Sequence, residues 1–316
     1  MIKDLNRRNI GDLIRNIVPC NPCRARARIN IVDDHLMQIS QIIRSQEFLP
    51  SVPKYLNLYE ALEIEPPKLA TLPYVMAPDG RRKLSKRHGA KDILDYKREG
   101  YLPEALINFL ASLGWHDGTD QEIFSLPELI EKFSLGRVQR GGAKFDERRL
   151  QWMNGYWIRQ LSVDELYKRS DGFWPSSADR QIEQYKQKVL ALVQERLKHF
   201  SELPVLTNFF FEDLPVDLKL IDDNKQLGSL GRDQQKELLK TAVDRLSQID
   251  FVEKNLTDTL NSLLKETRQK PAVLFSLIRI ATTWAPASPE LAATLYVLGK
   301  QRSLRRLEAA VTALKK

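Results

Sequence analysis

Helical periodicity fills the carboxy-terminal half of this 316-residue chain and constrains its fold more than any other feature. Apolar residues recur three or four positions apart in four long stretches, which are residues 178–203, 233–249, 271–283 and 288–315. This spacing places the apolar side chains on one face of a helix, and that face must pack against other helices. No internal repeat accompanies the pattern, so this half is expected to form helical bundles rather than a solenoid.

Helix start and stop signals extend the helical pattern toward the middle of the chain. Residues 91–99 and 103–113 have helical spacing, and each segment ends at a glycine, Gly100 or Gly114. Capping boxes are predicted where Ser125 precedes Glu128 and where Ser162 precedes Glu165. We therefore expect mainly helical structure from about residue 91 onward.

An α/β pattern precedes these helices. Residues 29–32 form a short apolar run that predicts a strand, Asp33-Asp34 can cap, and residues 36–43 have helical spacing. A second helix is predicted from Ser51, with Leu56, Tyr59 and Leu62 on one face, to a stop at Pro66-Pro67. This region is expected to be the end of an α/β unit.

A basic loop follows that unit. Residues 72–76 read as a strand that enters the turn Pro78-Asp79-Gly80, and six of the residues from Arg81 to Lys91 are Lys or Arg. Lys83 and Lys86 flank Ser85 at a spacing that lets both ammonium groups reach one polyphosphate. On the sequence alone, a solvated basic turn or a localisation-type patch remains an alternative.

Composition excludes several classes of protein. Hydrophobic residues make up 42% of the chain, enough for two or three cores, yet no apolar stretch approaches the length of a membrane span. The amino terminus lacks the apolar core of a secretory signal, so a cytoplasmic location is expected. The net charge of +8 permits an anionic partner such as RNA. Cys20 and Cys23 form a single Cys-x-x-Cys pair, too few ligands for a closed zinc site, and receive no function.

Several strings in order resemble bacterial-type glutamyl-tRNA synthetase, a class I aminoacyl-tRNA synthetase. Residues 30–37 (NIVDDHLM) and 43–48 (IRSQEF) are similar to the end of that family's Rossmann-like catalytic domain, and residues 83–90 to its KMSKS-type loop. Residues 100–106, 113–115, 145–146 and 152–155 are similar to its region that contacts the tRNA stem, and residues 298–300 with 305–307 to its carboxy-terminal end. The resemblance covers about residues 30–316, and ordered strings are far more specific than one motif.

The resemblance implies ATP-dependent glutamylation of tRNA-Glu in two steps. The glutamate carboxylate attacks the α-phosphate of ATP, and the terminal ribose of the tRNA then captures the glutamyl group. Catalysis of this kind consists mainly of positioning and charge stabilisation, with Mg²⁺ sharing the charge. By the match, Lys86 neutralises the departing pyrophosphate, Lys83 assists it, and Ser85 holds the loop. These three form the implied catalytic set, and no protein residue is expected to be a resident metal ligand.

The resemblance also assigns binding residues. Arg44 matches the position that binds the carboxylate of glutamate, although an exposed arginine on a helix surface is the alternative. Asn30 matches a second position of the glutamate pocket. Glu47 and Phe48, with Lys83 and Lys86, match ATP-binding positions. Arg196 falls where family members that recognise the anticodon place an arginine, although a solvated helix residue is the alternative.

Another basic group lies near the end of the chain. Arg302, Arg305 and Arg306 form a predicted basic face, which is either a phosphate-contacting surface or an ordinary helix surface.

The amino-terminal segment departs from the family. No His-x-Gly-His string of the HIGH type occurs, and Arg26 stands where the family commonly has tyrosine. We therefore expect a chain that lacks the first half of the catalytic domain and is inactive alone. A parallel sheet without its first strands exposes apolar edges, which predicts a marginally stable catalytic remnant beside a helical region with complete cores.

The expected architecture is mainly α, a remnant of a Rossmann-like α/β catalytic domain followed by an α-helical stem-contact region and an all-α anticodon-binding region. The predicted divisions are 1–28 (atypical segment), 29–68 (catalytic remnant), 69–161 (stem contact with the KMSKS-type loop), 162–225 and 226–316 (two anticodon-binding domains).

Two hypotheses follow for the function. The first is a partial glutamate–tRNA ligase that uses ATP, Mg²⁺, L-glutamate and tRNA-Glu, acts as a monomer, and binds neither membrane nor DNA. The second is a tRNA-binding module that does not charge its tRNA. The presence of Asn30, Arg44, Lys83 and Lys86 favours descent from an enzyme, because a pure tRNA binder has no use for them.

Overall fold

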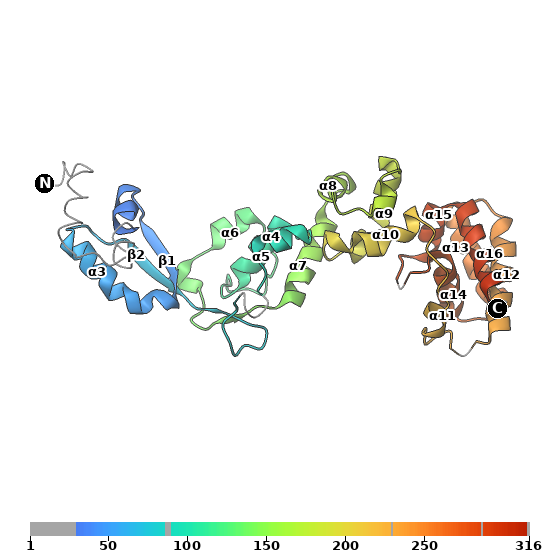
Figure 1. Cartoon of the computed structure of the whole chain (residues 1–316), viewed down its shortest axis with the longest axis horizontal. Helices are drawn as coiled ribbons and strands as arrows, with labels where there is room; N and C mark the ends of the chain where they lie inside the picture. Colours follow the sequence, from blue (N-terminus) through green and yellow to red (C-terminus); the bar gives the residue numbers. More distant parts are fainter. Residues whose placement is uncertain (1–29, 86–89, 229, 286, 315–316) are drawn as a thin grey trace. The chain divides into compact units, whose positions relative to one another are not determined.

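The computed structural model describes residues 30–85, 90–228, 230–285 and 287–314 (Figure 1). These residues form two compact units. The first comprises the described residues up to Ala90 together with Leu110–Asp146, and the second comprises Lys91–Phe109 together with the described residues from Glu147 onward. Predictions about Cys20, Cys23, Arg26 and Lys86 lie outside the described residues.

The first unit contains the α/β part of the chain. Its elements are a helix over residues 30–36, the strand β1 (Gln41–Ser45), the 3-10 helix η1 (Gln46–Ser51), the helix α3 (Val52–Ala61) and the strand β2 (Lys68–Leu72). Strands β1 and β2 pair in parallel, with Ile42 opposite Leu69 and Arg44 opposite Thr71. A parallel pair joined through helices is the expected signature of an α/β unit.

The predicted order of the first two elements is wrong. Residues 30–36 are helical, so Asp33 and Asp34 lie within a helix, and the strand β1 occupies part of the segment predicted to be a helix. The helix ends where Gln38 adopts φ 56° and the Ile39 N–H donates to the Asp34 carbonyl. Leu36, Ile39 and Ile43, whose spacing suggested a buried helix face, are all exposed. The helical spacing of these three residues therefore does not indicate a buried helix face.

The predicted second helix is confirmed as α3, with Pro53 in its first turn. Tyr59 and Leu62 are buried against Ile31, whereas Leu56 is exposed and does not belong to the buried face. The helix ends at Leu62, and Glu63 follows in the left-handed region with φ 54°, before the two prolines.

The basic segment lies on a hairpin, as predicted. The strand β3 (Val75–Met76) leads into the turn, and Met76 forms an antiparallel bridge with Lys83. The Leu84 N–H donates to the Val75 carbonyl at 2.8 Å, and Gly80 supplies the positive φ of 67° that the turn requires. On its other side β3 pairs in parallel with β4 (Ala143–Lys144). The hairpin is thus anchored at both arms.

The remaining elements are helices, and their labels follow Figure 1. They are α4 (Ile93–Arg98), α5 (Pro103–Ser112), α6 (Leu126–Lys132), α7 (Glu147–Gln160), α8 (Val163–Arg169), α9 (Glu183–Val193), α10 (Leu203–Phe211), α11 (Lys219–Asp222), α12 (Arg232–Ser247), α13 (Glu253–Thr267), α14 (Pro271–Thr283), α15 (Leu291–Leu298) and α16 (Lys300–Ala313). The capping box at Ser125 and Glu128 begins α6, and the Ser162 side chain caps α8.

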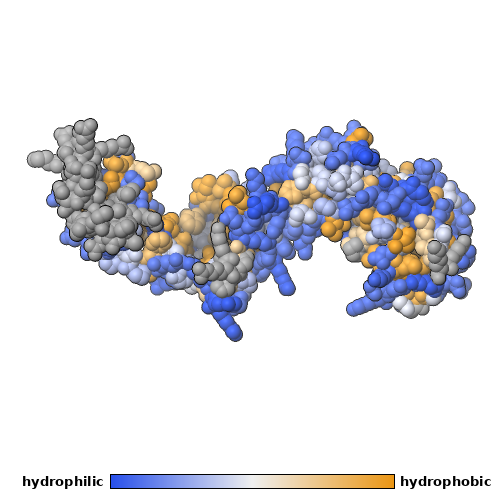
Figure 2. Space-filling model, in the orientation of Figure 1, coloured by the Kyte–Doolittle hydropathy of each residue, from blue (hydrophilic) through white to orange (hydrophobic). Residues whose placement is uncertain are grey.

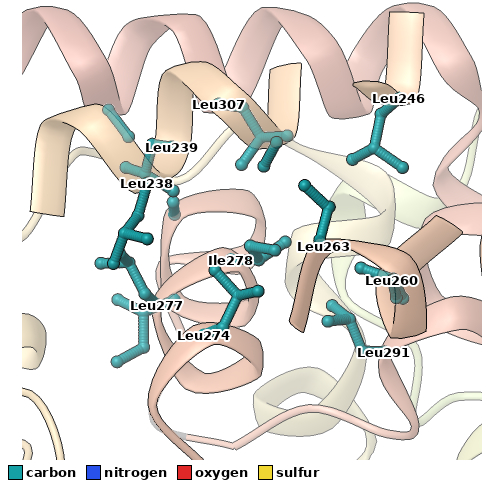
Figure 3. Close-up of a cluster of buried hydrophobic side chains, with 14 of the residues drawn as sticks. Leu238, Leu239, Leu246, Leu260, Leu263, Leu274, Leu277, Ile278, Leu291 and Leu307 are labelled. Atoms are coloured by element: carbon teal, nitrogen blue, oxygen red, sulfur yellow. The ribbon is translucent and has the colours of Figure 1, made fainter. Parts of the chain in front are cut away.

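Two hydrophobic cores fill the second unit. One joins α12 to α16, and Figure 3 shows its side chains meeting from α12, α13, α14, α15 and α16. The other packs α8, α9 and α10 with the start of α5. The predicted stretch 288–315 is two helices, because Gly299 at φ 80° interrupts it. The chain therefore has a mainly α fold with an α/β remnant, as expected.

Large apolar side chains are exposed in the α/β part. They are Leu36, Met37, Ile39, Ile43, Phe48, Leu49, Leu56 and Leu69. Figure 2 shows apolar surface (orange) in this part of the chain. Its buried cluster contains only Ile31, Tyr59 and Leu62, so little apolar area holds it together. In the part of the chain that the structure describes, no helix is long and apolar enough to cross a membrane.

Candidate functional site

A cavity in the first unit is lined by side chains from five successive elements between Asn30 and Thr71. It is lined by the helix over residues 30–36, by β1 and β2, by η1 and by α3. The lining residues are Asn30, Asp34, Ile42, Arg44, Phe48, Leu49, Val52, Tyr55, Tyr59, Leu69, Ala70 and Thr71. Asn30, Arg44 and Phe48, which the sequence assigned to glutamate and ATP binding, share this cavity.

Strand geometry places Arg44 at the cavity. Ile42 and Arg44 are two positions apart on β1 and so lie on the same face, and their partners Leu69 and Thr71 on β2 line the same cavity. The Arg44 guanidinium lies 5.0 Å from the centre of the Phe48 ring. This cation–π contact holds the guanidinium beside the cavity, where its forked donors can bind a carboxylate.

The hydroxyl of Tyr59 is buried at the same cavity. Burial raises its pKa, the negative charge of Asp34 raises the pKa further, and the positive charge of Arg44 opposes them. The hydroxyl therefore remains protonated at neutral pH and is a hydrogen-bond donor.

Two predicted ATP-binding residues are in direct contact. The Lys83 ammonium forms an ion pair with Glu47, and it also lies 5.0 Å from the centre of the Tyr74 ring. Backbone pairing of the hairpin at Met76 fixes the Lys83 main chain, so only the side chain is free to move. Ser85 accepts a hydrogen bond from the Ala90 N–H at 3.2 Å through its carbonyl. This hydrogen bond joins Ser85 to Ala90.

A second cavity lies within the helical unit and contains Arg196. It has a volume of about 370 Å³, and α11, α14 and the residues that follow α14 contribute to its wall. Arg279 of α14 shares this cavity, and the Nε atom of Arg279 is buried without a hydrogen-bond partner among the described residues. Burial lowers the pKa of Arg279, the nearby charge of Arg196 lowers it too, and Glu290 partly opposes them. Two arginines that repel one another across a cavity favour an anionic or acceptor-rich ligand.

Arg279 was missed by the sequence analysis. A signal was present, because Arg279 is the one charged residue within the segment 271–283. Arg196, by contrast, is exposed at the end of a 3-10 helix, η5 (Gln194–Arg196), which follows α9.

The predicted basic face of Arg302, Arg305 and Arg306 is not a free phosphate-binding surface. All three arginines form ion pairs with Asp213. Arg306 is only 5% exposed and donates to the carbonyls of Thr282 at 2.8 Å and Phe209 at 2.7 Å. Arg306 therefore joins α16 to the ends of α10 and α14 by hydrogen bonds. Its position in the sequence could not distinguish this structural role from that of an exposed arginine.

Part of the predicted stem-contact string 152–155 has a structural role. Asn154 of α7 is fully buried, accepts from the Leu102 N–H at 2.8 Å and donates to the Lys198 carbonyl. A Cβ atom on Gly155 would lie 3.2 Å from the Leu197 carbonyl oxygen, so the close approach of the backbone favours glycine. Trp152 of the same string is 47% exposed and is the member available to a partner.

The described residues include no group of three or more His, Cys, Asp or Glu side chains arranged to hold a metal ion.

Two family models match most of the chain. Residues 27–152 match the family model described as "tRNA synthetases class I (E and Q), catalytic domain", and residues 158–311 match the model described as "Anticodon binding domain". Together the two models account for the α/β part, the hairpin and the helical bundles.

Curated relatives and solved structures are similar along most of the chain. The glutamate–tRNA ligase of Dehalococcoides mccartyi strain 195 is 40% identical over 292 residues, which are 90% of this chain and 59% of the relative. The ligase of Moorella thermoacetica is 35% identical, over 89% of this chain and 58% of the relative. A crystal structure of a glutamate tRNA ligase from Elizabethkingia meningosepticum, in complex with its amino acid, has a TM-score of 0.77 at 25% identity and covers 91% of this chain and 60% of that one. The chain thus spans about three-fifths of the length of the relatives it matches.

Proposed function

The chain belongs by homology to the glutamate–tRNA ligases, and from this premise we propose that it contributes part of the amino-acid and ATP site and the tRNA-binding region of such a ligase. The observation that carries the proposal is the single cavity that gathers Asn30, Arg44 and Phe48. Three motif residues from a helix, a strand and a 3-10 helix line one cavity, and this arrangement is expected if they bind the same ligand.

In this proposal Arg44 binds a carboxylate of L-glutamate, and Asn30 contributes a second polar contact. A guanidinium suits the task because its two parallel N–H groups match the two oxygens of a carboxylate. Phe48 lies beside the guanidinium and supports it. The pocket therefore selects an anionic amino acid by charge and by geometry.

Lys83 and Lys86 act on the phosphates of ATP in the first step, with Ser85 holding the loop. Lys83 is already positioned on the hairpin, where Glu47 and Tyr74 are its contacts. An ammonium held this way can exchange Glu47 for a phosphate oxygen when the nucleotide binds. Lys86 receives its role from the sequence alone.

Mg²⁺ enters the proposal together with ATP, whose phosphates supply most of its ligands, as is usual for this ion. Glu47 and Lys83 offer contacts to the nucleotide that would carry the ion. The ion supplies charge neutralisation on the phosphates when it is bound.

The helical unit binds tRNA-Glu in this proposal. Arg196 and Arg279 share a polar cavity whose positive charge suits an unstacked base or a phosphate of the anticodon loop. We further propose a monomer in the cytoplasm, without a membrane or DNA partner, with the division at residues 162–225 and 226–316 as two anticodon-binding domains.

A second candidate function is tRNA binding without charging. The 316 residues contain four histidines and no His-x-Gly-His string, which is the feature that favours this candidate. A polypeptide of these residues is expected to bind tRNA while showing no ATP–pyrophosphate exchange with glutamate and tRNA present. Exchange above the background of a Lys83→Ala, Lys86→Ala double variant would contradict this expectation.

The glutamate site is tested by replacing Arg44 with lysine. The substitution keeps the positive charge but removes the bidentate geometry, so the dissociation constant for L-glutamate should rise at least about tenfold, or about 1.4 kcal/mol. Calorimetric titration of the 316-residue chain measures the change. Arg98→Lys is the matched control, since Arg98 is 70% exposed and pairs only locally with Asp95. Equal glutamate affinity in the wild type and the Arg44→Lys variant would refute the assignment of Arg44.

A further inference from the structure

The buried hydroxyl of Tyr59 is left without a protein partner. Tyr59 is 3% exposed, and its hydroxyl oxygen has no hydrogen bond to any group in the described parts of the chain. Buried polar groups are nearly always hydrogen-bonded, and an exception in a native fold calls for a specific reason. The ring itself is explained by packing, because it contacts the cluster around Ile31 and Leu62. The hydroxyl is not explained by packing.

The position of this hydroxyl suggests what it binds. Tyr59 lines the cavity that also contains Asn30, Asp34 and Arg44. Tyr59 is set on α3, whose first turn contains Pro53, so its ring borders the cavity from a rigid element. A ligand whose carboxylate is held by Arg44 therefore lies in the cavity that the Tyr59 side chain borders.

We propose that the Tyr59 hydroxyl donates a hydrogen bond to the ligand carboxylate bound by Arg44 and is a further binding residue for L-glutamate. The proposal rests on the glutamate-binding function proposed above. A carboxylate that accepts from both a guanidinium and a hydroxyl has more of its lone pairs satisfied in the cavity than a carboxamide of the same size. Tyr59 thus helps to discriminate an anionic amino acid from its amide.

The structure supplies a matched control for the test. Tyr296 lies on α15, outside this cavity, and is 42% exposed. Tyr59→Phe and Tyr296→Phe each remove one hydroxyl and leave the ring in place. Because the Tyr59 oxygen has no protein partner, its removal should not lower the thermal midpoint.

Isothermal titration calorimetry of the 316-residue chain with L-glutamate, glutarate and L-glutamine separates the outcomes. We expect Tyr59→Phe to raise the dissociation constants of glutamate and glutarate about tenfold, to change that of glutamine less, and to unfold at the wild-type temperature. Tyr296→Phe should change each constant less than about twofold.

Two results would overturn the inference while leaving the proposed function standing. One is wild-type affinity for glutamate in the Tyr59→Phe variant, and the other is a loss for glutamate without a loss for glutarate, since the hydroxyl would then contact a group other than the carboxylate. A wild-type chain that binds neither ligand would instead contradict the proposed glutamate site, and Tyr59 with it.

Discussion

Arg306, which is buried, and Arg279, which is half-buried, show that burial alone does not predict the role of an arginine in the helical unit. Arg306 is almost fully buried and donates to four protein groups, on Asp213, Thr282, Phe209 and Glu212, so it is structural. Arg279 keeps a buried Nε without a partner and faces a cavity. The unsatisfied donor, and not the burial, marks the candidate site.

Asp117 provides a pH test at the scale of one residue. Its side chain is 4% exposed, accepts from the Thr119 hydroxyl and N–H, and pairs with Lys132 at 3.1 Å. The Thr119 hydrogen bonds, helped by Lys132 and opposed by burial, lower the pKa of Asp117 to about 2. Because this pKa lies below that of the unfolded chain, the carboxylate stabilises the fold above about pH 4 and loses this effect as the pH falls toward 2.

We therefore expect Asp117→Asn to lower the thermal midpoint at neutral pH, with the difference from wild type shrinking as the pH is reduced from about 5 to about 2. Circular dichroism melts across this range measure the difference. Asp120→Asn, at an exposed carboxylate of the same loop, is the control. A difference from wild type that stays constant across the range would show that the Asp117 charge does not carry the effect.

At the scale of elements, Asn154 joins α7 by hydrogen bonds to the backbone at Leu102 and at Lys198, each of which precedes another helix. Replacing it by leucine keeps the volume but orphans the Leu102 N–H and the Lys198 carbonyl. The free energy of unfolding should fall by about 2–4 kcal/mol, measured by urea denaturation. Asn261→Leu on the exposed face of α13 is the control and should change it by less than about 0.5 kcal/mol. Equal effects of the two substitutions would contradict this role of Asn154.

Helices with strong local signals were predictable from the sequence. The segment 271–283 coincides with α14, and the capping box at Ser125 begins α6, because proline and capping side chains act within one turn. The strand β1 was mispredicted because Leu36, Ile39 and Ile43 have helical spacing without burial. Parallel pairing with β2, which decides the element, depends on residues 27 positions away and leaves no local trace.

The candidate site was predictable only as a set of motif residues. The resemblance identified Asn30, Arg44, Glu47 and Lys83, but the shared cavity and the Glu47–Lys83 contact come from tertiary structure. Tyr59 and Arg279 carried no family assignment in the sequence analysis. Their orphaned polar atoms became evident only once the packing around them was known.

At the scale of the whole chain, the two units differ in how much apolar surface they bury. Among the described residues, the α/β part has a buried cluster of three residues, while the bundle from α11 to α16 has a core of 21. Amide hydrogen exchange should therefore be faster in β1, β2 and α3 than in α14, because local opening is less costly where few contacts are lost. Mass spectrometry of peptides from both regions measures this, and slow exchange in β1 equal to that in α14 would refute the prediction.

In the proposed function the helical unit binds tRNA-Glu through the cavity that contains Arg196 and Arg279, and filter binding over a salt series tests this proposal most directly. We predict that the logarithm of affinity for a tRNA-Glu transcript falls linearly with the logarithm of salt concentration, and that altering the anticodon weakens binding. Arg196→Met and Arg279→Met should each weaken binding of tRNA-Glu by about tenfold and reduce the effect of the anticodon. The control Arg245→Met, at an exposed arginine paired with Glu266, should match wild type. Affinity that is insensitive to the anticodon and unchanged by both cavity substitutions would contradict the account.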